Sequence, residues 1–260
     1  MNISQNAFLL GDHNVYFYAS SNEKRRVLFS NLKAGLDRGC SALYIASGEN
    51  IEQIQVEMRA FGLKLDNPMK LKIVTSGQWY TPDGEFHADR VVKQYRSLID
   101  ESVDRGFEGL YVSADVADTF DYLSKNLTPW LKYENSLGRI FKLPMEAICA
   151  YHINQIISNS QALPQLLQGH KNTVTAKTAN LIDNKKLYMD AATEEFNNIL
   201  GEEATKTIFH YLEVTFKLTI DQIPDKVEEF NEKLQPTLGR ATLLINQTIL
   251  KNLYGKIELR

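Results

Sequence analysis

The chain has 260 residues, of which 43% are hydrophobic and 10% aromatic, enough to bury a sizeable core and too many for a disordered protein. Its formal net charge is −3, and neither residues 1–185 nor residues 186–260 have an excess of basic side chains, so the charge does not favour nucleic-acid binding. No segment resembles a signal peptide or approaches the ~20 apolar residues of a membrane span, so we expect a cytoplasmic protein with no membrane partner.

Residues 9–49 have the pattern of strand, tight loop, helix and strand. Residues 15–18 are rich in β-forming side chains, and the small polar residues 19–22 suit a turn and a helix N-cap. Apolar side chains then recur at helical spacing until Gly39, which is expected to end the helix, and residues 42–46 form a second strand. This βαβ unit predicts parallel strands covered by helices.

The alternation of strands and helices continues as far as residue 168. We predict further strands over 71–75, 110–113 (ending at Asp115) and 145–151, helices over 51–61, 87–105, 116–142 (interrupted at Pro129), 153–158 and 162–168, and a loop over 77–86. For the helix over 87–105, we expect Val91, Val92, Tyr95, Leu98 and Val103 to face inward. The order indicates an α/β fold with a mostly parallel sheet and helices on both faces.

A small all-α domain is predicted to follow the sheet. Residues 171–188 are polar and prone to turns, which is typical of a linker or of a marginal strand pair. Helical periodicity dominates residues 189–260, so we divide the chain into a sheet domain over 1–170, a linker over 171–188 and a helical domain over 189–260.

The first βαβ unit has the layout of a RecA-type nucleotide-binding core but lacks its phosphate loop. That loop needs G-x-x-x-x-G-K-[ST], whose glycines let backbone N–H groups approach the phosphates. With Lys24 at the lysine position, Tyr18 and Glu23 replace the two glycines and Arg25 replaces the hydroxyl residue. We therefore expect a RecA-like scaffold with a degenerate ATP site and without ATPase activity.

Three short motifs make the resemblance specific. They are D-H-x-x-x-F-Y (Asp12, His13, Phe17, Tyr18), A-G-L-x-R-G (residues 34–39) and the strand that ends in Gly48 and Glu49. They resemble the MEDS family, the sensory domains first described in methanogens and methylotrophs and related to the KaiC branch of RecA-like proteins. The resemblance covers roughly residues 8–170 and implies a ligand-sensing signalling domain, with a reported link to hydrocarbon derivatives.

Further positions resemble the MEDS pattern, and others resemble a second kind of domain. Tyr133, Glu134 and the run 149–152 match the MEDS pattern, although His152 stands where that family usually has Asp. In the tail, residues 201–204 (G-E-E-A), 211–218 and 249–254 resemble a short archaeal output domain found in sensory proteins.

The carboxyl ends of the strands are the expected ligand site, because ligands of open α/β sheets bind there. The candidate ligand-binding residues, from these ends and from the family positions, are His13, Tyr16, Tyr18, Ser20, Glu49, Trp79, Tyr80, Asp115, Glu134, Tyr151 and His152. Several have structural alternatives. His13 can hydrogen-bond a neighbouring loop, Asp115 can cap a helix, Glu49 suits a helix N-terminus, and Trp79 and Tyr80 can pack over the sheet.

We expect no catalytic residue, no metal site and no resident cofactor, with a bound nucleotide as the alternative. His13, Glu49 and His152 are a conceivable metal set, but nothing in their spacing supports it. Cys40 and Cys149 lie in or beside apolar strands and are expected to be buried free thiols.

The leading functional hypothesis is a non-catalytic sensory protein. It would bind a small molecule at the strand ends and signal through its helical domain to a protein partner or within a homodimer. The first alternative is a divergent nucleotide-binding protein or ATPase that uses Lys24, Arg25, Glu49 and Asp115, which a thermal-shift screen with nucleotides would detect. The second alternative is a transcriptional regulator, which requires salt-sensitive retention on DNA.

Overall fold

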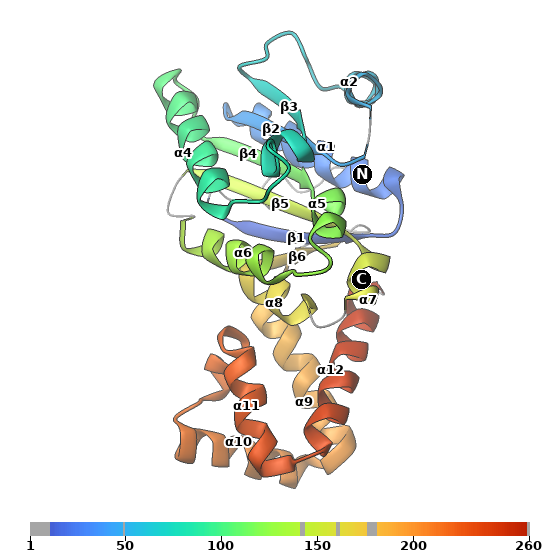
Figure 1. The fold of residues 1–260 in the computed structure, drawn as a ribbon, viewed down its shortest axis with the longest axis vertical. Coiled ribbons are helices and arrows are strands. Elements are labelled where there is room, and N and C mark those ends of the chain that lie inside the picture. The colour runs from blue at the N-terminus through green and yellow to red at the C-terminus, as the bar shows by residue number, and fades with distance from the viewer. Residues whose placement is uncertain (1–10, 49, 141–143, 160–161, 176–180, 259–260) are drawn as a thin grey trace.

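A computed structural model describes residues 11–48, 50–140, 144–159, 162–175 and 181–258 (Figure 1). Within these residues, seven strands form one sheet in the order β3-β2-β4-β5-β1-β6-β7. The strands are β1 (His13–Tyr18), β2 (Ser41–Ala46), β3 (Leu71–Thr75), β4 (Leu110–Asp115), β5 (Met145–His152), β6 (Asn172–Val174) and β7 (Leu181–Asp183). All neighbouring pairs are parallel except β6 and β7, which pair antiparallel.

Helices cover both faces of the sheet, as predicted. The helices α1 (Ser21–Asp37) and α2 (Ile51–Ala60) bury Val27, Leu28, Leu32, Ile54 and Met58 against one face. The other face packs against α4 (Ala88–Asp104), α6 (Thr128–Ile140) and α8 (Ala162–Gly169). The short helices α3 (Ser76–Tyr80), α5 (Ala117–Tyr122) and α7 (Ile153–Ser158) lie in the connections. The expected α/β fold is therefore confirmed.

Helix packing and the end of the helix α1 explain the two glycines of the motif over residues 34–39. Gly35, on α1, faces Tyr111 of β4 so closely that an added Cβ would lie 2.3 Å from the Tyr111 ring carbon Cγ. Only a residue without a side chain lets α1 approach the sheet this closely. Gly39 has φ of 81° directly after the C-cap Arg38, which ends α1 where the sequence predicted.

Three predictions in the sheet region were wrong in part. Residues 77–80 of the loop predicted over 77–86 belong to α3, because Thr75 and Gln78 form a reciprocal capping box. Val103 is 48% exposed, whereas Ile99 and Ser102 take the inward positions of α4. The segment 116–142 breaks before Pro129, which lies in the first turn of α6, where its missing N–H costs nothing.

Residues 172–174 and 181–183 extend the sheet as the strands β6 and β7. The strand pair weighed against a linker for this segment is thus present, and β6 pairs with β1. Residues 184–188, also assigned to the linker, already belong to α9, which Asp183 caps by accepting from the Lys186 backbone N–H at 2.9 Å.

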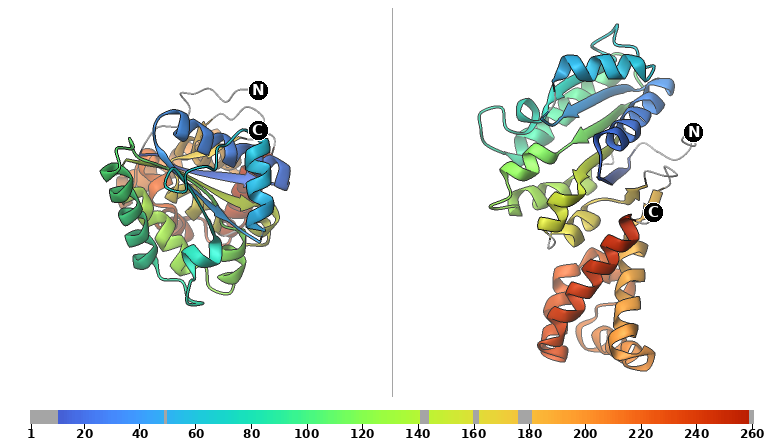
Figure 2. Two further views of the ribbon diagram at one scale, coloured as in Figure 1. Left: turned by 90° about the horizontal axis from the view of Figure 1, so that it is seen from above. Right: turned by 90° about the vertical axis from the view of Figure 1, so that its right-hand side faces the viewer.

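A helical region follows, as predicted (Figure 2). It consists of α9 (Asn184–Leu200), α10 (Glu202–Phe216), the 3-10 helix η1 (Ile220–Asp225), α11 (Val227–Leu238) and α12 (Ala241–Glu258). Its apolar core is continuous with the core between the sheet and α6 and α8. The α12 helix returns to the sheet region, where the Tyr254 hydroxyl donates to the Ile156 carbonyl oxygen at 2.9 Å. Among the described helices, none is long and apolar enough to cross a membrane.

Candidate functional site

The predicted strand edge holds a buried ion pair. Tyr18 ends β1, Asp115 ends β4, and the Tyr18 hydroxyl donates to Asp115 Oδ1 at 3.1 Å. Lys24 of α1 places Nζ 2.5 Å from the second oxygen, Oδ2, and both charged residues are at most 3% exposed. Burial raises the pKa of Asp115, and the charge of Lys24 opposes the shift. The edge thus brings Tyr18 and Asp115 together, as predicted, around a lysine that neutralises the carboxylate.

The connection from β1 to α1 is short. Only residues 19–20 separate Tyr18 from the first residue of α1. The Ser20 hydroxyl caps the helix by accepting from the Glu23 backbone N–H at 3.4 Å. A two-residue connection offers far fewer backbone N–H groups than the glycine-rich loop that cradles phosphates.

Other predicted residues at this edge make structural contacts. The His152 ring packs edge-on against Tyr18, with centroids 5.2 Å apart, and His152 caps α7 by accepting from the Asn154 backbone N–H. Tyr16 is buried on the same face as Tyr18, and its hydroxyl has no hydrogen-bond partner among the described residues. Glu49 lies outside the described residues.

Trp79 and Tyr80 are buried in the core. Each ring packs against another aromatic ring at a centroid distance of 5.1 Å, Trp79 against Tyr95 and Tyr80 against Trp130. Packing, the structural alternative considered for these two residues, accounts for both.

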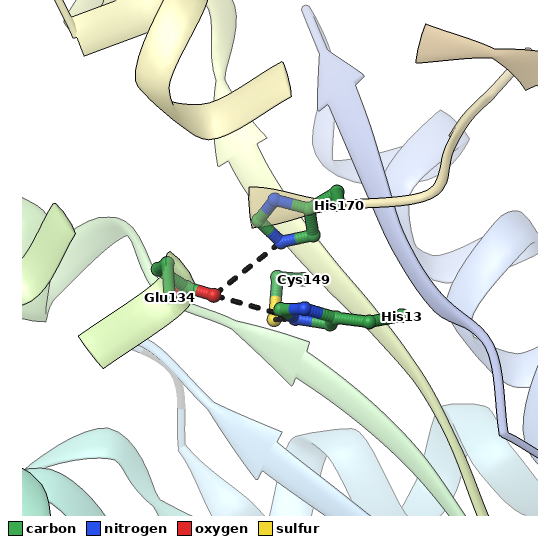
Figure 3. A group of neighbouring side chains, drawn as sticks. All are labelled: His13, Glu134, Cys149 and His170. Carbon is green, nitrogen blue, oxygen red and sulfur yellow. Dashed lines mark hydrogen bonds and ion pairs between the residues drawn. The ribbon is translucent and has the colours of Figure 1, made fainter. Parts of the chain in front are cut away.

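A second polar cluster lies between the sheet and its helices (Figure 3). His13 begins β1, Cys149 lies within β5, Glu134 belongs to α6 and His170 directly follows α8. One ligand atom from each lies within 4.8 Å of the other three, and all four residues are at most 4% exposed. The ligand-binding residues predicted from the sequence include His13 and Glu134 but not Cys149 or His170. The metal set considered there is not formed, since His13 and His152 lie toward opposite ends of adjacent strands.

Both imidazole rings are held in place by main-chain oxygens. His13 Nδ1 donates to the Gly169 carbonyl at 3.0 Å, and His170 Nδ1 donates to the Leu166 carbonyl at 2.6 Å. Because a carbonyl oxygen only accepts, each ring has a proton on Nδ1 and turns Nε2 toward the cluster. The Nε2 atoms lie 3.3 Å (His13) and 3.4 Å (His170) from the same Glu134 oxygen, Oε2.

Burial controls the charge of this cluster. It lowers the pKa of His13 and of His170 to about 3, so both rings are neutral near pH 7. It raises the pKa of Glu134, although His170 and the Tyr151 hydroxyl oppose this shift, and it raises the pKa of Cys149 far above its usual value. Tyr151, another predicted residue, donates to Glu134 Oε1 at 2.7 Å.

A pocket of about 290 Å³ opens beside the two histidines. One wall comes from the sheet region and includes His13, Gly169 and His170. The opposite wall comes from the helical region, with residues of α9, η1 and α11 that include Tyr188 and Val227. Of the predicted ligand residues that the structure describes, His13 alone borders this pocket.

Asn184, the first residue of α9, joins the two walls. Its side-chain amide donates to the Leu167 and His170 carbonyl oxygens at 3.2 and 2.9 Å, and its oxygen accepts from the Thr173 hydroxyl at 2.6 Å. The backbone that carries His170 is therefore fixed directly to the beginning of the helical region.

The solved structures that are similar to this chain include two ATPases. No curated protein matches the chain. The assembled ATPase EscN from the type III secretion system of enteropathogenic E. coli is 12% identical, with a TM-score of 0.40 over 97% of this chain and 71% of that one. A prototypical ATPase from the type III secretion system of pathogenic bacteria is also 12% identical, with a TM-score of 0.42 over 99% and 84%.

The family model that matches is MEDS, the MEthanogen/methylotroph, DcmR Sensory domain, and it covers residues 12–171. This segment begins one residue before His13 and ends one residue after His170, so it contains the whole buried cluster. Because the match spans more than half of the 260 residues, the chain belongs to the MEDS family of sensory domains.

Proposed function

We propose that this chain is a sensory protein in which a small molecule, bound between the sheet and the helical region, sets how these two parts pack. The observation that carries the proposal is the pocket of about 290 Å³ whose opposite walls come from the two parts. A molecule held between two parts favours the arrangement that it fits best, by as much as its affinity differs between arrangements. Membership of a sensory family agrees with this role.

The lining favours a small, mainly apolar molecule with a polar group. Leu167, Tyr188 and Val227 supply apolar surface, whereas Lys171 and Asp225 add opposite charges. The volume lies near the lower end of the roughly 300–1,000 Å³ that is typical of small-molecule sites. A short hydrocarbon derivative fits this description better than a nucleotide, which needs several phosphate contacts.

Contacts around the pocket provide a route to the helices. Besides Asn184, the Gln168 amide of α8 donates to the Asp225 carbonyl oxygen of η1 at 2.5 Å. The Gln165 amide donates to Glu228 of α11 at 2.8 Å. These hydrogen bonds are exposed to solvent and cost little free energy to break, so occupancy of the pocket can shift η1 and α11 relative to α8. The helical region then presents the changed surface to a partner protein or to a second copy of the chain.

We further infer that the strand edge is not a nucleotide site. The two-residue connection after β1 provides no phosphate cradle. Lys24 is the one residue retained from the phosphate-loop pattern, and it forms an ion pair with Asp115. No catalytic residue is proposed, and the edge residues Tyr18 and His152 serve the scaffold.

The proposal is tested by blocking the mouth of the pocket. Lys185 lines the pocket and its side chain is 60% exposed, so Lys185→Trp places a bulky ring there without disturbing the core. Lys186→Trp is the matched control, since Lys186 is also exposed but does not line the pocket. A library of short-chain alcohols, carboxylic acids, amines and alkyl halides is screened by saturation-transfer NMR.

We expect members of the library to bind the wild-type protein and Lys186→Trp but not Lys185→Trp. Binding that Lys185→Trp leaves unchanged, or the absence of binding by every compound, would refute the proposed site. Binding of ATP with Mg²⁺ to the wild-type protein would favour the nucleotide alternative instead.

A further inference from the structure

The buried cluster presents more lone pairs than protons. With Nδ1 of both histidines donating to carbonyl oxygens, the two Nε2 atoms and Glu134 Oε2 face one another as acceptors. Glu134 Oε2 and His170 Nε2 are buried without a hydrogen-bond partner among the described residues. A buried acceptor left in this way costs about 1–3 kcal/mol, so something that accepts electron pairs is expected there.

The distances suit a single metal ion. His13 Nε2 lies 3.3 Å from both Cys149 Sγ and Glu134 Oε2, and His170 Nε2 lies 3.4 Å from Glu134 Oε2. A tetrahedral ion with bonds of about 2.0–2.3 Å to nitrogen, oxygen and sulfur separates its ligand atoms by roughly 3.3–3.8 Å. These three distances fall at the short end of that range, and the other three pairs of donor atoms lie within 4.8 Å of one another.

The surroundings of the cluster resemble those of metal ligands. Metal-binding histidines usually donate their other ring N–H to a carbonyl or a carboxylate, as His13 and His170 do. The carboxylate is oriented in turn, because Tyr151 donates to Glu134 Oε1 and itself accepts from the Trp130 indole N–H at 3.0 Å. These partners fix the orientation of the His13, His170 and Glu134 donor atoms.

The donor set selects the class of ion. Two imidazoles, one carboxylate and one thiolate suit a borderline ion such as Zn²⁺ and not the oxygen-preferring Mg²⁺ or Ca²⁺. Four protein ligands in a buried position are typical of a closed structural site. The neighbouring pocket, which His13 and His170 border, supplies an entry path.

We propose that His13, Glu134, Cys149 and His170 bind one Zn²⁺-class ion. The Cys149 thiol releases its proton to solvent on binding, so one thiolate and one carboxylate neutralise the dication. The ion joins β1, α6, β5 and the residue after α8, and it fixes the segment that Asn184 ties to α9. The site is independent of whether the pocket takes a small molecule, since its donor atoms come from the cluster alone.

The test uses the full chain, freed of metal with a chelator and then loaded with Zn²⁺ or Co²⁺. We expect about one ion per chain by elemental analysis, as a single four-ligand site requires. Co²⁺ should give the visible bands of a tetrahedral ion and a near-ultraviolet thiolate-to-cobalt charge-transfer band.

Matched variants assign the ligands. Cys149→Ser should lose the charge-transfer band, whereas Cys40→Ser, which alters the other buried free cysteine, should keep it. His170→Asn should weaken Zn²⁺ binding beyond the roughly 10–100-fold caused by losing an outer partner, and His210→Asn on the surface of α10 should not. Tyr151→Phe keeps all four donors and should weaken binding by that roughly 10–100-fold, which keeps the test valid if His170→Asn fails to fold.

Metal-free protein that gives no charge-transfer band with Co²⁺ and takes up no Zn²⁺ would overturn the site and leave a proton shared between Glu134 and a histidine. A charge-transfer band that survives Cys149→Ser but disappears in Cys40→Ser would also overturn it. Neither result bears on the pocket of about 290 Å³, whose small-molecule binding is measured separately.

Discussion

Replacing Lys24 by methionine should lower the free energy of unfolding by about 3–5 kcal/mol, the usual cost of removing one partner of a buried ion pair. The ammonium lies 2.5 Å from Asp115 Oδ2, and the Lys24 and Asp115 side chains are 4% and 1% exposed. Methionine fills much of the same volume, so the loss is chiefly electrostatic. The carboxylate keeps its hydrogen bonds from Tyr18 and from the Ala117 backbone N–H, which are too few to replace a full charge.

The loss of stability should depend on pH, because protonation removes the unpaired buried charge of Asp115. Burial already raises the pKa of Asp115, and removing Lys24 raises it further. A folded-state pKa above the unfolded value means that the folded protein binds more protons, so stability falls as pH rises between the two values. The variant should therefore lose more stability, relative to the wild-type protein, at about pH 8 than at about pH 5.5.

Urea unfolding at the two pH values measures the effect. Lys33→Met is the control, because Lys33 forms an exposed pair with Asp37 on the same helix and should change stability by no more than about 0.5 kcal/mol. The double variant Lys24→Met/Asp115→Leu should recover most of the loss, since two apolar residues replace a buried pair at little cost.

Two results would refute this reasoning. A Lys24→Met protein as stable as the control would show that the pair does not contribute to stability. A rise in the melting temperature of the wild-type protein with ATP and Mg²⁺, abolished by Lys24→Met, would show that Lys24 binds nucleotide.

Three further predictions concern other parts of the fold. Burial raises the pKa of Glu146 to about 8, so the contribution of Glu146 to stability falls as pH rises from about 4.5 to about 8. Over that interval, the stability of Glu146→Gln relative to the wild-type protein should rise by on the order of 2–4 kcal/mol. A difference in urea unfolding that does not change with pH would contradict this. Gly35→Ala should cost about 1–3 kcal/mol or more through its clash with Tyr111, and an unchanged melting temperature would disprove the close approach. Tyr254→Phe should cost about 0.5–1.5 kcal/mol by removing the bond to Ile156, with faster hydrogen exchange at the end of α12 but not in α10; equal exchange in α12 would count against its docking.

The sheet could be predicted from the sequence because buried parallel strands are continuous apolar runs. The strand over 71–75 was predicted with its observed bounds, and the strand predicted over 145–151 extends one residue further in the structure, to His152. The strands β6 and β7 have only three residues each, and Asn172 joins the sheet through a hydrogen bond to Asn14 of β1. Such pairing depends on tertiary contacts that no local pattern contains.

The buried cluster was only partly predictable. His13 and Glu134 were selected through family motifs, and Cys149 lay in a matching run but was interpreted as a buried free thiol, which it is in the structure. His170 was assigned to a boundary between domains. It is 157 residues from His13 in the chain, and the two ring centroids lie 3.9 Å apart, with the rings tilted by 35°, only because α8 ends beside the start of β1. Sequence spacing carries no signal for that contact.

Hydrogen exchange of the whole chain, measured with and without a library compound that binds, tests the central claim most directly. We predict slower exchange on binding at the end of α8 and in η1 and α11 together, because these elements line the pocket from both sides. Slower exchange confined to the strand edge around Lys24 and Asp115, with η1 and α11 unchanged, would contradict the account.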